Sequence, residues 1–68
     1  MGENKIGIVV DRVRLEIRKE PDPNAEILQE ILAGSEVMVY AEGTTKHFYK
    51  VCTAYGVVGY CMRDFIKM

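Results

Sequence analysis

The sequence predicts an all-β fold: a small barrel of five to six short antiparallel strands, with a 3-10 turn near the C-terminus. Short segments in which apolar and polar residues alternate recur along the chain, and turns containing glycine separate them. With 68 residues, we expect residues 1–68 to form a single domain with a small core. A barrel or two packed sheets would cover the edges and apolar faces that one open sheet leaves exposed.

Two strands are expected before the first long loop. Residues 6–10 are a β-branched run, and residues 13–17 place Val13, Leu15 and Ile17 on one apolar face with charged side chains between them. Residues 19–24 contain two prolines and two acidic residues, so they are expected to form a loop.

Residues 25–33 are compatible with either a helix or a short strand. For a helix, Asp22 or Asn24 would be the N-cap, Pro23 would lie just inside, and Gly34 would be the stop. For a strand, the same residues form a turn followed by an extended segment. The helix would make the fold α+β rather than all-β.

The C-terminal half of the sequence predicts strands without a helical alternative. Residues 37–41 alternate in a strand, residues 47–53 form an aromatic and β-branched strand, and Gly56 reverses the chain into a strand at residues 57–61. Tyr49 shares the parity of Val51 and is therefore expected in the core. Residues 62–66 are long enough for one 3-10 turn.

Composition argues against several classes of function. Nine basic and ten acidic residues give a formal net charge of -1 and are interleaved along the chain, so we expect no nucleic-acid partner. The apolar stretch of residues 6–10 is too short for a signal-peptide core or a membrane span, so no membrane insertion is expected.

The chain contains few groups suited to catalysis or metal binding. One histidine and two cysteines, without a close acidic cluster, are too few ligands for a metal, and no cofactor is expected. His47 and Cys52, five residues apart on one strand, point to opposite faces, so no catalytic pair and no enzyme is expected. Cys52 and Cys61 fit no common zinc or redox spacing; they are either separate thiols or a disulfide.

Several short motifs, in this order, resemble the bacterial Src-homology-3 (SH3-like) family over residues 6–66. The motifs are Leu15-x-Ile17-Arg18, Pro21, Ile27 to Gly34, Val37-x-Val39, Phe48-Tyr49-Lys50-Val51, Gly59-Tyr60 and Phe65-Ile66. Phe48 and Tyr60 stand where the family commonly has tryptophan, and Glu16 replaces the usual asparagine. The resemblance implies that residues 26–32 are a strand, with Ile27 and Ile31 turned inward.

The resemblance also implies a non-catalytic binding or targeting module that recognises peptidoglycan or an extended peptide through loop 19–26 and nearby tyrosines. The candidate site residues are Glu16, Arg18, Lys19, Asp22, Tyr40, Tyr55 and Tyr60. Arg18 either holds a ligand carboxylate in a bidentate fork or holds the loop through backbone carbonyls. The alternative function is a structural or assembly domain of a phage or mobile-element protein, or a spacer in a larger chain, with weak self-association.

Overall fold

The computed structural model describes residues 4–68, and within them the chain is all-β, as predicted. It forms seven strands and one 3-10 turn, one strand more than expected because the last strand has only two residues. The elements are β1 (Lys5–Val9), β2 (Arg14–Arg18), β3 (Ile27–Leu32), β4 (Glu36–Tyr40), β5 (Phe48–Thr53), β6 (Val58–Met62), η1 (Arg63–Phe65) and β7 (Ile66–Lys67).

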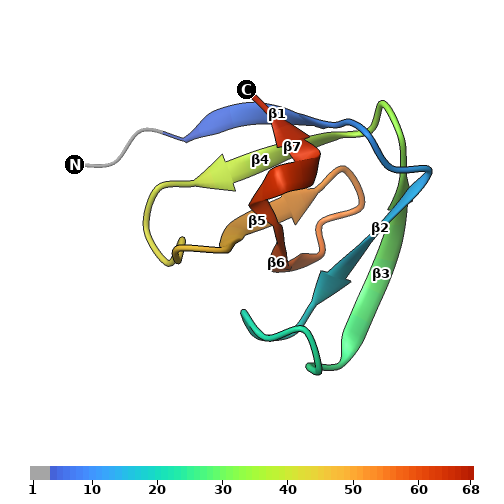
Figure 1. Ribbon diagram of the computed structural model, residues 1–68. Coiled ribbons are helices and arrows are strands. Elements are labelled where there is room, and N and C mark those ends of the chain that lie inside the picture. The colour runs from blue at the N-terminus through green and yellow to red at the C-terminus, as the bar shows by residue number, and fades with distance from the viewer. Residues whose placement is uncertain (1–3) are drawn as a thin grey trace.

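All seven strands belong to one antiparallel sheet in the order β3-β2-β6-β5-β4-β1-β7. The sheet curls around its own apolar face into a small barrel, with the β2–β3 ribbon standing at one side (Figure 1). The turn η1 returns the chain to β1, where the Val10 N–H donates to the Phe65 carbonyl at 2.9 Å. The predicted barrel and the predicted 3-10 turn are therefore both confirmed.

The segment that admitted two interpretations is the strand β3, and the helical interpretation is wrong. β3 pairs with β2 from Arg14 opposite Leu32 to Ile17 opposite Gln29, and the register then shifts before Arg18 opposite Ile27. Ile31 is buried as expected, but Ile27 is 46% exposed. Because a register shift interrupts the alternation of faces, the inward placement expected for Ile27 is wrong.

The core is a single cluster of side chains from all seven strands. Its buried members are Val9, Leu15, Ile17, Ile31, Val37, Val39, Val51, Cys61 and Ile66. Tyr49 packs against this cluster, as expected. Val13 is 77% exposed, contrary to the prediction, because it precedes β2 and lies at the turn where its carbonyl accepts the Ala33 N–H.

Gly59 allows β2 and β6 to approach closely. A Cβ atom at this position would lie 2.6 Å from the Arg18 carbonyl oxygen and 2.7 Å from Cγ2 of Ile17. These are distances that real Cβ atoms essentially never show, so a side chain at position 59 would push the two strands apart. Only one register pair, Arg18 opposite Tyr60, joins β2 to β6.

Candidate ligand-binding surface

A row of basic and aromatic residues crosses four neighbouring strands on the outer face of the sheet. Arg18 on β2 is the Cα partner of Tyr60 on β6, Tyr60 is the partner of Lys50 on β5, and Lys50 is the partner of Tyr40 on β4. Each directly follows an inward-facing residue of its own strand, and each is half-buried. At about 4.8 Å between strands, the row spans about 14 Å. We call these four residues the cationic-aromatic row.

A second row runs parallel to the first, displaced by two residues on β4, β5 and β6, and it continues onto β1 instead of β2. Val58 pairs with Cys52, Cys52 with Met38, and Met38 with Ile6. Val58, Met38 and Ile6 are exposed, and Cys52 is half-buried. We call these four residues the apolar row. The outer face therefore carries a polar stripe with two cations beside an apolar stripe.

The two rows are in contact and border two shallow hollows. Interaction with the Cys52 side chain raises the pKa of Tyr40, so the two rows meet at these two residues. A hollow of about 380 Å³ is lined by Asn4, Tyr40, Glu42, Lys50 and Val58. Another of about 310 Å³ is lined by Ile6, Glu36, Val37, Met38, Tyr40, Cys52, Thr53 and Ala54. Tyr40 lines both hollows.

The loop between β2 and β3 is held by its own hydrogen bonds and by Arg18. Nη1 of Arg18 donates to the Ala25 carbonyl at 2.7 Å, and the Lys19 N–H donates to the Glu26 carbonyl at 2.8 Å. Oδ1 of Asp22 accepts the Asn24 N–H at 2.8 Å, which forms a local turn. The role of holding the loop, one of the two considered for Arg18 from the sequence, is thus observed.

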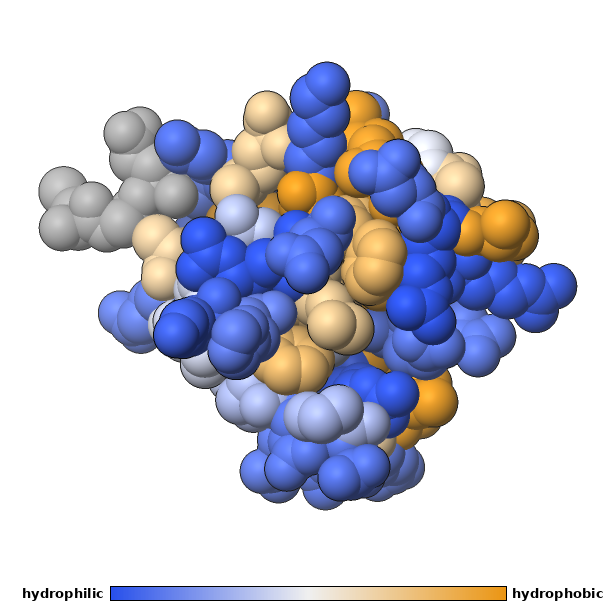
Figure 2. Space-filling model, in the orientation of Figure 1, coloured by the Kyte–Doolittle hydropathy of each residue, from blue (hydrophilic) through white to orange (hydrophobic). Residues whose placement is uncertain are grey.

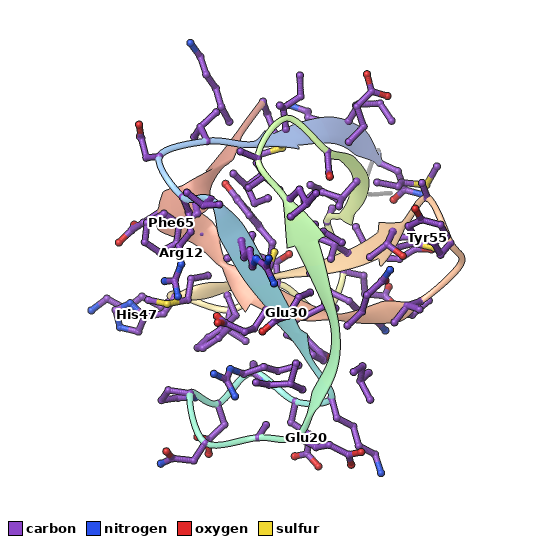
Figure 3. The ribbon with its side chains drawn as sticks, turned by 90° about the vertical axis from the view of Figure 1, so that its right-hand side faces the viewer. Arg12, Glu20, Glu30, His47, Tyr55 and Phe65 are labelled. Atoms are coloured by element: carbon purple, nitrogen blue, oxygen red, sulfur yellow. The ribbon has the colours of Figure 1, made fainter. Side chains whose placement is uncertain are left out.

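The loop also forms a hollow of its own. It has a volume of about 340 Å³ and is lined by Lys19, Glu20, Asp22, Asn24, Ala25 and Glu26. Figure 3 shows the loop at the foot of the β2–β3 ribbon, with Glu20 pointing away from the sheet. Arg18 lies at the junction between this hollow and the cationic-aromatic row.

The structure brings only some of the sequence-predicted site residues together. Arg18, Tyr40 and Tyr60 lie in one row, and Lys19 and Asp22 lie in the adjoining loop.

Two predicted site residues lie elsewhere. Glu16 forms an ion pair with Arg12 at 3.3 Å and faces Glu30 across β2 and β3. Tyr55 is 82% exposed in the β5–β6 turn, well away from the loop in Figure 3.

Lys50 belongs to the row but was not among the predicted site residues. Lys50 is two residues from Cys52 and adjacent to the buried Val51, so the alternation along β5 places its side chain on the outer face. This alternation can be read from the sequence. Its neighbours Tyr60 and Tyr40 come from other strands, so the row itself depends on strand register. Figure 2 shows hydrophilic side chains separating patches of hydrophobic surface on the face it displays.

The two cysteines are free thiols on opposite faces of the sheet. Cys61 is inside the barrel, and burial raises the pKa of its thiol to about 12. Cys52 lies on the outer face in the apolar row. The disulfide left open by the sequence is therefore not formed in this structure.

Residues 4–68 contain no group of three or more His, Cys, Asp or Glu side chains arranged to hold a metal ion. His47 is exposed and directly precedes β5, while Cys52 lies near the end of the same strand. In the same part of the chain, no helix has the length and apolar character needed to cross a membrane.

The chain was compared with models of known protein families. The family model described as bacterial SH3 domain matches residues 13–67, which include the β2–β3 ribbon, the loop and three members of the apolar row. Comparison with curated proteins gives no match. All four residues of the cationic-aromatic row lie inside the matched range.

Proposed function

The chain belongs to the bacterial SH3 domain family, and on this basis we propose that it is a non-catalytic module that binds a peptide in extended conformation. The peptide stems of bacterial peptidoglycan are the first ligand to test. Domains of this family are generally non-catalytic binding modules and often bind cell walls. The ligand and the residues that contact it are our proposal.

The cationic-aromatic row is the observation that carries this proposal. Tyr40 and Tyr60 offer flat apolar rings with hydroxyl groups, which suit a peptide backbone and its side chains. Arg18 and Lys50 offer charged donors for carboxylates. Lys19 and Asp22 in the adjoining loop extend the same surface. An extended ligand lying along the row would contact all four strands.

The proposal is tested by titrating the ¹⁵N-labelled domain with soluble peptidoglycan fragments and following the amide spectrum. We expect shifts confined to the row and to loop 19–26. Tyr60→Ala removes a ring from the row, whereas Tyr55→Ala removes the same ring from the β5–β6 turn and is the matched comparison. Loss of binding in Tyr60→Ala alone is expected. Equal loss in both variants, or an unchanged spectrum of the parent domain, would contradict the proposal.

The apolar row favours a second candidate function, a structural or assembly domain. Ile6, Met38 and Val58 expose aliphatic surface side by side on the sheet, and such a surface can pack against another copy. Sedimentation velocity over a range of concentrations separates the candidates. A binding module remains monomeric, whereas an assembly domain shows a species that grows with concentration and is lost in Met38→Lys.

A further inference from the structure

We infer that the ligand is an acidic peptide with two carboxylates two or three residues apart, one bound by Arg18 and the other by Lys50. This inference rests on the proposed function, because it assigns the chemistry of the ligand for the same surface. It goes beyond that function by fixing the sign, the number and the spacing of the charges on the ligand.

The spacing follows from the register of the sheet. Arg18 and Lys50 are both Cα partners of Tyr60, so exactly one strand lies between them. Two inter-strand steps of about 4.8 Å separate their Cα atoms by about 10 Å. An extended peptide rises about 3.4 Å per residue, so positions two or three residues apart are about 7–10 Å apart. The flexible side chains of arginine and lysine accommodate either separation.

The hydrogen bonding of the Arg18 side chain favours binding of a carboxylate. Its guanidinium carries five N–H donors, and one of its nitrogens is engaged by the Ala25 carbonyl. That bond fixes the side chain, so less conformational freedom is lost when a carboxylate binds the remaining donors. The nearest outward acid on the same strand, Glu16, is already paired with Arg12 at 3.3 Å.

Lys50 supplies the second positive charge. Among residues 4–68 it forms no ion pair within 4 Å, although Glu42 lines the same hollow. Glu42 is the one acidic residue among those that line this hollow. The row itself contains two cations and no acid, and the phenol hydroxyls of Tyr40 and Tyr60 can also donate to carboxylate oxygens.

The apolar row indicates which other side chains the acidic peptide carries. Ile6, Met38 and Val58 lie one row away, about 7 Å along the strands. A peptide with its carboxylates on the cationic-aromatic row would place aliphatic side chains against these residues. A strongly polar acidic peptide without aliphatic residues is therefore a weaker ligand than one with both.

The test uses two probes and two variants of the whole domain. The probes are soluble muropeptides with free carboxylates and the same muropeptides after conversion of the carboxylates to amides. The variants are Lys50→Met and, as a charge-matched control, Lys67→Met on β7, three strands away from β5. Affinities come from amide NMR titrations at low and at high salt, and the dispersion of each spectrum confirms that the variant is folded.

We expect amidation to weaken binding by at least tenfold, Lys50→Met to weaken the free-acid probe by about tenfold, and Lys67→Met to leave it unchanged. Equal affinity for the two probes would overturn the acidic ligand while leaving the proposed function standing. Equal losses in the two lysine variants would indicate a general charge effect and would also overturn the inference. Failure of both probes to bind the parent domain would count against the proposed function itself.

Discussion

Replacing Gly59 with alanine tests the close approach of β2 and β6. The new Cβ would lie 2.6 Å from the Arg18 carbonyl oxygen, a backbone atom that cannot move away without disturbing the single register pair between β2 and β6. Overpacking of this kind costs about 1–3 kcal/mol, and replacement of a glycine within a strand recovers about 0.5–1 kcal/mol. We therefore expect Gly59→Ala to lower the free energy of unfolding by about 1–2 kcal/mol.

Thermal unfolding and guanidinium titration followed by circular dichroism measure this loss. For a domain of this size, 1 kcal/mol corresponds to about 4–8 °C, so the midpoint should fall by about 5–15 °C. Because the clash lies at Arg18, the amide signals of Arg18 and Tyr60 should also move, and affinity for any ligand of the cationic-aromatic row should fall.

Gly34→Ala is the matched control for Gly59→Ala. Position 34 has φ +84° but nothing within 4 Å of the new Cβ, so its cost of about 1 kcal/mol arises only from the backbone conformation. The control should leave the Arg18 and Tyr60 signals in place. If Gly59→Ala unfolds at the same guanidinium concentration as the parent, or perturbs β2 no more than the control does, the close approach of β2 and β6 is refuted.

Three further changes have expected outcomes. Thr53→Val removes the hydroxyl that donates to Oε1 of Gln29 at 2.8 Å and should cost about 1–3 kcal/mol by denaturant titration, while Thr53→Ser should retain most of that stability. A thiol reagent should modify Cys52 in the folded protein and Cys61 only on unfolding. Burial raises the Cys61 pKa from 9.0 to about 12, so the folded state holds this proton more tightly than the unfolded state does. The free energy of unfolding should therefore fall as the pH rises from about 9 to about 12. Cys61→Val should remove this contribution to the pH dependence of the free energy of unfolding. Arg18→Met should broaden the amide signals of residues 19–26 and leave those of the core strands sharp.

The sequence predicted which face of a strand each side chain occupies better than it predicted how the strands pair. Alternation within a strand assigns each side chain to a face, and for Arg18, Tyr40 and Tyr60 this gave outward positions that the structure confirms. Register between strands separated in sequence depends on the packed core, so the position of Lys50 between Tyr60 and Tyr40 was not predicted. The core position of Tyr49 followed from parity alone.

Ile27 and Tyr55 show where local patterns fail. The face of Ile27 changes at the register shift in the β2–β3 pair, and such a shift depends on how the long loop closes rather than on the residues of β3. Tyr55 is a candidate binding residue because of its residue type alone. It lies in the β5–β6 turn, outside the cationic-aromatic row. Whether it contacts a ligand stays a prediction for the Tyr55→Ala comparison.

The attachment of the β2–β3 ribbon has a consequence for motion. β2 pairs with β3 at five register positions but with β6 at one, whereas β4, β5 and β6 are joined to one another at four and five positions. Local opening of the ribbon should therefore require less free energy than opening of the central strands, and its amide hydrogens should exchange sooner. A ligand held by Arg18 on β2 and Lys50 on β5 would connect these two parts, so exchange in the ribbon should slow when it binds.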